Sequence, residues 1–222
     1  MKNTLFLLAL LFLLSISSCN LIDDLTEDEN ELNGETDIAL NETGNTFSTT
    51  ANVNGTYVPI TTSATITESD KGLVKVALTA DLTGVPELSK FTDLIPAEYK
   101  DQLGRINVEA KGKITSEGFQ DFTNSDDAAF TMVKYDSKVG DTYKLKKSDG
   151  NTITRTVTQK STDDDFSYGF YLIKTITVEQ DSRIPGINKI IYKFNHKFGL
   201  VYFEVVAEDG STVGSLVYPQ NY

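Results

Sequence analysis

Hydrophobic and polar residues alternate along most of the chain from about residue 51 onward. The stretch RINVEAKGKI at 105–114 has apolar residues or glycine at every second position and mainly charged residues between them. The stretch LVKVALTADL at 73–82 repeats this pattern. A period of two is typical of antiparallel strands that pack one face on a core and expose the other. The pattern therefore predicts a mainly β domain.

Turn signals separate the alternating stretches. Asp149-Gly150 and Asp209-Gly210 each lie between two of them, and Asp-Gly pairs in this position are typical of β-hairpin turns. A Pro-Gly pair at 185–186 predicts another turn. About ten strands with short connections favour a single antiparallel β-sandwich or a strongly curved β-meander or half-barrel.

One stretch inside this domain follows a different period. Between Glu87 and Leu103 the apolar residues have helical spacing, and Pro96 interrupts them. We therefore expect one or two short helices there. Their apolar positions before the proline are Leu88, Phe91, Leu94 and Ile95.

Two stretches, SYGFYLIKT and GLVYFEVV, place apolar side chains on both faces of a predicted strand. In the first, Tyr171 and Ile173 would lie opposite the other aromatic side chains; in the second, Leu200 and Tyr202 would lie opposite the predicted core. A half-exposed strand does not need apolar groups on its second face. Either the helical stretch covers this face, or Tyr171, Ile173, Leu200 and Tyr202 form an exposed patch that binds a partner or ligand.

The beginning of the chain is typical of a signal peptide over residues 1–18. Lys2 precedes an apolar run at 5–14 that would span only ~15 Å as a helix, about half of a membrane's hydrocarbon core. The sequence ISSC that ends at Cys19, the one cysteine, resembles the lipobox of bacterial lipoproteins. That resemblance implies cleavage before Cys19 and lipidation of its sulfur and its new amino group. The alternative is a free thiol at the end of an ordinary secretory signal.

An acidic segment follows the cysteine. Between Asn20 and Asp70 there are eleven acidic residues and no lysine or arginine. The polar composition up to about residue 50 predicts a disordered acidic tether over 19–50, followed by the β domain at 51–222. Acid close after Cys19 is similar to the segment found in lipoproteins that some Bacteroidetes export. The resemblance implies attachment to the outer membrane and allows exposure at the cell surface.

Composition restricts the chemistry of the domain. A net charge of −12 argues against nucleic-acid binding. His196 is the one histidine, so the sequence offers few residues for a catalytic triad and too few histidines for a multi-histidine metal site. The acidic runs at Asp163–Asp165 and Asp126–Asp127 lack the spacing of a calcium loop and are interpreted as solvated turns. We expect no catalysis, no cofactor and no bound metal.

The sequence therefore favours a lipid-anchored envelope or cell-surface protein that acts as a non-catalytic binding module for a protein or polymer. The alternative is a carrier or sensor of a lipid or another hydrophobic ligand. It depends on the segment FNHKFGLVYFEVVAEDG at 194–210, which resembles envelope lipoproteins with a curved antiparallel sheet. That resemblance implies a half-barrel whose concave apolar face holds the ligand.

Overall fold

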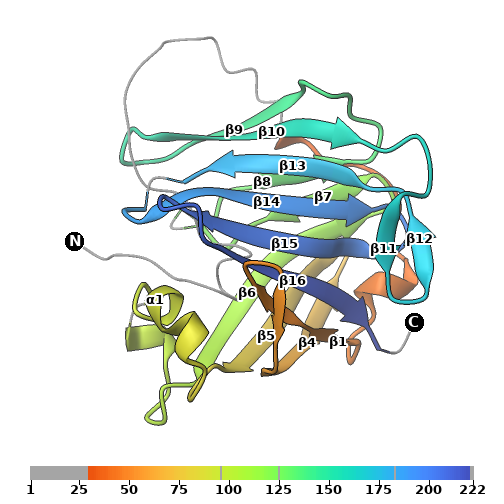
Figure 1. Ribbon diagram of the computed structural model, residues 1–222. Helices are drawn as coiled ribbons and strands as arrows, with labels where there is room; N and C mark the ends of the chain where they lie inside the picture. Colours follow the sequence, from red (N-terminus) through yellow and green to blue (C-terminus); the bar gives the residue numbers. More distant parts are fainter. Residues whose placement is uncertain (1–29, 96, 125, 183, 221–222) are drawn as a thin grey trace.

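The computed structural model describes residues 30–220 except 96, 125 and 183, and strands occupy most of that range (Figure 1). The strands before residue 140 are β1 (Thr46–Thr49), β2 (Ala51–Val53), β3 (Thr56–Val58), β4 (Thr61–Asp70), β5 (Leu73–Asp81), β6 (Ile106–Thr115), β7 (Gly118–Asp121) and β8 (Phe130–Lys134). The later strands are β9 (Thr142–Lys146), β10 (Thr152–Lys160), β11 (Phe166–Tyr168), β12 (Tyr171–Ile173), β13 (Ile176–Asp181), β14 (Ile187–Asn195), β15 (Gly199–Ala207) and β16 (Thr212–Pro219). The helical segments are the 3-10 turns η3 (Ala39–Asn41), η4 (Pro86–Leu88) and η5 (Ala97–Tyr99) and the short helix α1 (Ser89–Thr92).

Fourteen of these strands form one large antiparallel sheet. Its order is β8-β7-β6-β5-β4-β1-β16-β15-β14-β13-β10-β9, with β2 attached to β16 and β3 to β2. The sheet curves back so that its first half, β8 to β1, lies behind its second half, β16 to β9 (Figure 1). β11 and β12 form a separate hairpin. The prediction of a mainly β, strongly curved antiparallel domain with a short helix is confirmed.

The two edge strands of the sheet, β8 and β9, lie near each other but are not paired by backbone hydrogen bonds. The backbone N–H of Lys134 on β8 donates to the hydroxyl of Tyr143 on β9 at 3.0 Å. The guanidinium of Arg155 on β10 donates to the carbonyls of Phe130 and Thr131 on β8, at 3.0 and 3.3 Å. Side chains thus bridge the gap between the edges, and the sheet is nearly closed like a barrel.

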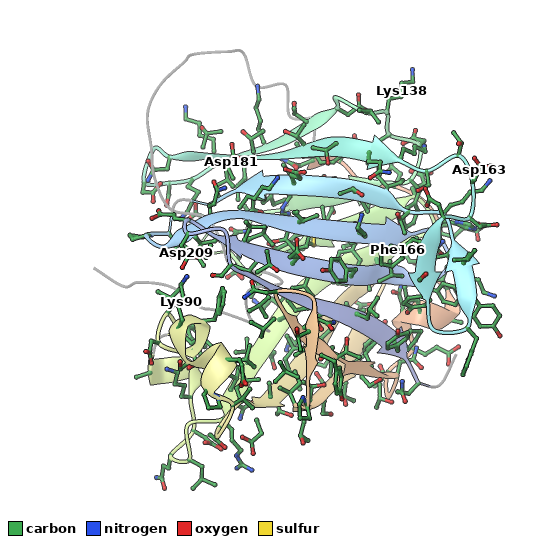
Figure 2. All side chains as sticks on the ribbon, in the orientation of Figure 1. Lys90, Lys138, Asp163, Phe166, Asp181 and Asp209 are labelled. Carbon is green, nitrogen blue, oxygen red and sulfur yellow. The ribbon has the colours of Figure 1, made fainter. Side chains whose placement is uncertain are left out.

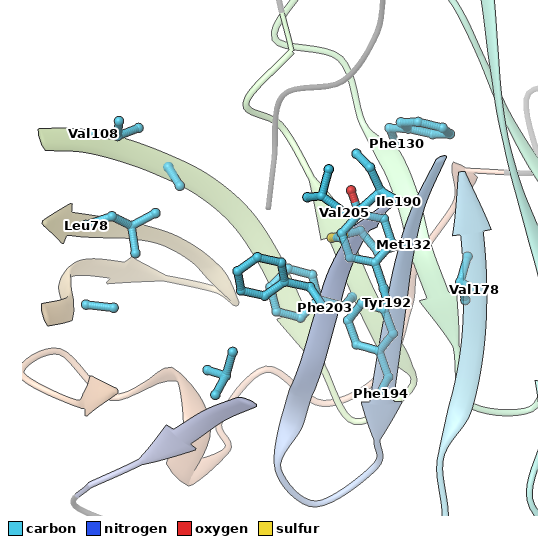
Figure 3. Close-up of a cluster of buried hydrophobic side chains, with 14 of the residues drawn as sticks. Leu78, Val108, Phe130, Met132, Val178, Ile190, Tyr192, Phe194, Phe203 and Val205 are labelled. Atoms are coloured by element: carbon cyan, nitrogen blue, oxygen red, sulfur yellow. The ribbon is translucent and has the colours of Figure 1, made fainter. Parts of the chain in front are cut away.

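The alternating pattern decides which side chains fill the interior. On β6, Ile106, Val108 and Ala110 are buried, whereas Asn107 and Glu109 are exposed. Burying a large apolar side chain contributes about 1.5–3 kcal/mol, so this shared core holds the two halves of the sheet together. Figure 3 shows side chains from both halves meeting there: Leu78, Val108, Phe130, Met132, Val178, Ile190, Tyr192, Phe194, Phe203 and Val205.

The predicted Asp-Gly hairpin turns are confirmed. Gly150 joins β9 to β10 with φ +85°, and Gly210 joins β15 to β16 with φ +83°. Residues with a Cβ rarely adopt such values, which is why glycine occupies both positions. The preceding aspartates support the turns: Asp149 and Asp209 each accept a hydrogen bond from the backbone N–H two residues later, at 2.9 and 3.0 Å.

The helical stretch around α1 closes one end of the barrel. Leu88, Phe91 and Ile95 are buried in the main core, and Lys90 pairs with Asp209 in the β15–β16 turn (Figure 2). The expectation that this stretch covers the second face of the Tyr171 strand is wrong, because α1 and the β11–β12 hairpin lie on opposite sides of the molecule (Figure 1). None of the helical segments in the described ranges is long and apolar enough to cross a membrane.

The predicted boundary near residue 50 is also wrong, because residues 30–50 belong to the folded domain. Leu32 and Leu40 are buried, and β1 is a strand of the main sheet. The side chain of Asn30 bridges the two sheet edges: its Oδ1 accepts from Thr131 N–H at 2.9 Å, and its Nδ2 donates to the Lys144 carbonyl at 2.7 Å. The signal peptide, Cys19 and the tether up to residue 29 lie outside the described residues and stay predictions.

Candidate binding groove on the outer face of the sheet

The structure separates the four residues predicted to form one exposed patch. The supposed strand SYGFYLIKT belongs to the hairpin β11–β12, which turns at Gly169 with φ +61°. Tyr171, next to the turn, is 69% exposed, whereas Ile173 at the base is 7% exposed. The prediction failed because glycine permitted a turn inside a run of strand-forming residues.

A β-bulge separates the other two residues. Lys193 pairs with Tyr202, but the next residue, Phe194, pairs with Leu200, so Val201 is an extra residue in β15. The bulge turns Leu200 inward onto the main core and leaves Tyr202 on the outer face. The single patch of Tyr171, Ile173, Leu200 and Tyr202 is therefore wrong, and Tyr202 alone of the four lines the groove described below.

The β11–β12 hairpin is fixed to the outer face by a second, smaller hydrophobic cluster. Tyr168, Ile173 and Val201 are buried at its centre. The Tyr168 hydroxyl donates to the Val217 carbonyl on β16, and its ring stacks on Tyr218 with 4.8 Å between centroids. The hairpin is therefore packed firmly against the second half of the sheet and borders its outer face on one side.

A groove of about 630 Å³ lies beside this hairpin, on the outer face of the second half of the sheet. Its floor comes from β10, β13, β14, β15 and β16, and β11 and β2 border it. The lining combines aromatic, aliphatic, amide, hydroxyl and charged side chains. These residues are Asn52, Thr158, Gln159, Phe166, Ser167, Thr177, Glu179, Ile191, Lys193, Tyr202, Glu204 and Leu216.

Strand register places these side chains in rows. Glu179 on β13 pairs with Ile191 on β14, which pairs with Glu204 on β15. In the neighbouring row, Lys193 on β14 pairs with Tyr202 on β15. Side chains of directly paired residues lie on the same face about 5 Å apart at Cβ, so two carboxylates, an ammonium group and a phenol gather in the middle of the groove.

Tyr202 is held flat across the groove floor. Its hydroxyl donates to Glu204 Oε2 at 2.8 Å, and its ring lies 6.0 Å from that of Phe166, tilted by 58°. A Cβ at Gly214 would lie 2.2 Å from the Tyr202 hydroxyl, so a larger residue beneath the phenol would displace it. Burial and the hydrogen bond to Glu204 raise the pKa of the Tyr202 hydroxyl above its ordinary value.

The charged side chains of the groove have protein partners yet keep some access to solvent. Lys193 Nζ donates to Thr177 Oγ1 at 3.1 Å and lies 5.5 Å from the centroid of the Phe166 ring. Burial lowers the pKa of Lys193, against the opposing effect of nearby acids. Glu179 accepts from Lys189 Nζ at 2.6 Å, and both side chains are about one-third exposed. A ligand can therefore reach these groups without entering the core.

The residues considered for other chemistry lie elsewhere. His196 is exposed in the turn between β14 and β15, and Asp163–Asp165 lie in the loop before β11. Neither joins the groove lining. Across the described residues, no group of three or more His, Cys, Asp or Glu side chains is placed to hold a metal ion.

A small, partly open apolar pocket of about 70 Å³ adjoins the main core. Leu40, Phe47, Phe119, Phe198 and Leu200 are among the residues that line it. An apolar cavity of ~150 Å³ holds one benzene-sized molecule, so this space does not match a lipid acyl chain.

Comparisons with protein-family models, curated proteins and solved structures found no match to this chain. The groove is therefore described from its own residues. Sequence reasoning found Tyr202 but missed Phe166, Glu179, Lys193 and Glu204. One signal in the sequence could have indicated the groove. Ile191 is apolar, although it lies on the outward face of β14 together with Lys189 and Lys193.

Proposed function

We propose that this chain is a lipid-anchored protein of the outer membrane whose domain binds an extended neutral carbohydrate without catalysis. The observation that carries the proposal is the outer-face groove, where the rings of Phe166 and Tyr202 lie beside two carboxylates, an ammonium group and amide and hydroxyl side chains. Sugars offer apolar C–H faces to aromatic rings and hydroxyls to polar side chains, so both kinds of lining group have a use.

Charge favours a neutral carbohydrate over an anionic one. The chain has a net charge of −12, and the groove contains Glu179 and Glu204 against the single ammonium of Lys193. An acidic polysaccharide would meet like charge here, which is unfavourable. A neutral chain of sugars can donate hydroxyls to both carboxylates and accept from Lys193.

The anchor part of the proposal depends on the lipobox-like ISSC sequence and the acid after it. Metabolic labelling with a radioactive fatty acid tests it. We expect the label in the full chain but not in Cys19→Ser, which should be found in the soluble envelope fraction. Equal labelling of both proteins would exclude acylation at Cys19. Protease added to intact cells would then show whether the domain faces outward.

The carrier alternative has less support from the described residues, because the apolar pocket is small and the apolar face of the sheet is filled by its own side chains. Leu200, which was predicted to belong to an exposed patch, contributes to this filling.

Titration calorimetry with soluble α-glucan, β-glucan, mannan and xylan oligosaccharides tests the carbohydrate proposal. We expect at least one neutral oligosaccharide to bind, with the affinity at least tenfold lower in Tyr202→Ala and in Phe166→Ala. Leu103→Ala is the matched control, because Leu103 is 68% exposed on a loop outside the groove. No binding by any of the four, or binding that both groove variants leave unchanged, would overturn the proposal.

A further inference from the structure

We infer that the tip of the β11–β12 hairpin inserts into the lipid surface and forms a second membrane contact beside the lipid anchor. The inference rests on the anchor in the proposed function, not on carbohydrate binding. Three consecutive large side chains at this tip face solvent: Phe170 is fully exposed, Tyr171 is 69% exposed and Leu172 is 58% exposed. Large contiguous exposed apolar groups usually mark an interaction site.

The fold presents the tip as a rigid projection. Ile173 at the hairpin's base and Tyr168 directly before the turn are buried against Val201, so the hairpin is fixed to the sheet along its length and only the tip is left in solvent. Figure 1 shows the hairpin projecting at one side of the barrel. Because the turn at Gly169 and Phe170 is only two residues long, the side chains of the tip are presented without a flexible loop.

Charge is absent from the hairpin and present at its base. Residues 166–173 contain no Asp, Glu, Lys or Arg, in a chain of which 23% is charged. Asp165 precedes the hairpin and Lys174 follows it directly. At a membrane, the apolar tip would lie in the acyl region and the charged base in water. The tyrosine would lie between them in the interfacial layer, where tyrosine is enriched.

The dimensions favour a lipid surface over a protein partner. A stable protein interface takes about 800 Å² and some 20–30 residues from each partner, whereas three residues make up this tip. Cys19 precedes Asn30 by eleven residues, and an extended chain of that length reaches at most about 36–40 Å. A compact domain of this size has a radius of gyration of about 16 Å, so an anchored chain can bring the hairpin to its own membrane.

The chain contains no tryptophan, so one introduced at the tip reports its surroundings alone. Acylated full-length Phe170→Trp is reconstituted into phosphatidylcholine vesicles with or without bromine-labelled acyl chains. We expect a blue-shifted tryptophan emission and at least a twofold loss of intensity with the brominated lipid. Leu103→Trp, in the loop that follows η5, is the matched control and should show neither effect.

Mass spectrometry of the same preparation separates the two possible failures. If Cys19 carries no acyl group, the proposed anchor is wrong, and the inferred second membrane contact is wrong as well. If Cys19 is acylated but the tryptophan of the Phe170→Trp variant emits as in water and is not quenched, the hairpin inference alone is wrong. Emission that responds to a neutral oligosaccharide instead of to the lipid would also overturn it and would assign the tip to the groove.

Discussion

Two polar clusters in this protein use the same kinds of side chain in opposite settings. Inside the barrel, Arg155 lies beside Asp121 and over the ring of Phe130; outside, Lys193 lies near Glu204 and the ring of Phe166. Both inner charged side chains are 1% exposed, whereas the outer ones line an open groove. The comparison shows that accessibility, and not residue type, separates a cluster that only protein groups contact from one that is open to a ligand.

The inner cluster satisfies its charges entirely with protein groups. Arg155 Nε donates to Gln180 Oε1 at 2.8 Å, Nη2 donates to Asp121 Oδ2 at 3.2 Å, and the guanidinium carbon lies 3.7 Å from the centroid of the Phe130 ring. The same side chain donates to two carbonyls of β8 and so helps to close the barrel. Its role is to join strands from the two edges of the sheet.

The largest expected effect comes from breaking this inner cluster. Arg155→Met should lower the free energy of unfolding by about 3–5 kcal/mol, because it leaves the Asp121 carboxylate buried without its cation. Urea denaturation measures this loss. Arg105→Met is the control: Arg105 pairs with Asp101 on the surface, where the expected loss is under about 1 kcal/mol. Similar losses in the two variants would mean that the inner cluster is no more important than a surface ion pair.

The second prediction concerns the pH dependence of the inner cluster. Burial raises the pKa of Asp121 to about 6, against the opposing effect of Arg155. Because the folded protein holds this proton more tightly than the unfolded chain, the contribution to stability is fully present below pH 3.8 and is lost as the pH rises to about 6.

Denaturant unfolding of the wild type and Asp121→Asn across this pH range isolates the effect. We expect the wild type to lose on the order of 2–3 kcal/mol relative to the variant between pH 4 and pH 6.5, since each pKa unit corresponds to about 1.4 kcal/mol. A difference that stays constant or changes in the other direction would show that Arg155, not burial, dominates the pKa of Asp121.

The smallest expected effect on stability comes from the outer groove. Gly214→Ala should push the Tyr202 phenol off the groove floor, because the new methyl group would overlap the hydroxyl. Since Tyr202 can swing toward solvent, we expect a loss of only about 1 kcal/mol, at the low end for overpacking. Affinity for the bound oligosaccharide should fall at least tenfold.

Tyr202→Phe separates the two contributions of this side chain. It keeps the ring but removes the hydrogen bond to Glu204, so calorimetry should show a smaller loss of affinity than in Gly214→Ala, with almost unchanged stability. If Gly214→Ala binds as the wild type does, the position of Tyr202 has no part in binding. If it instead loses as much stability as Arg155→Met, the outer cluster would resemble the inner one.

The sequence alone determined the parts of the fold that depend on neighbouring residues. The period of two assigned Ile106, Val108 and Ala110 to the core, and the Asp-Gly pairs located two hairpin turns. It also located the short helical stretch, although not the face on which Leu88 and Phe91 pack. Such features could be predicted because side-chain alternation and positive φ at glycine are properties of a few adjacent residues.

Tertiary structure decided what depends on strands far apart in the chain. The bulge at Val201 arises from pairing with β14 and reverses the expected directions of Leu200 and Val201. Residues 30–50 look too polar to fold by themselves, yet Leu32 and Leu40 are buried against later strands. The groove likewise exists only because register brings Glu179, Lys193 and Tyr202 from three strands onto one face. One extra residue in a strand changes which face its side chains occupy, and local alternation cannot reveal such a shift.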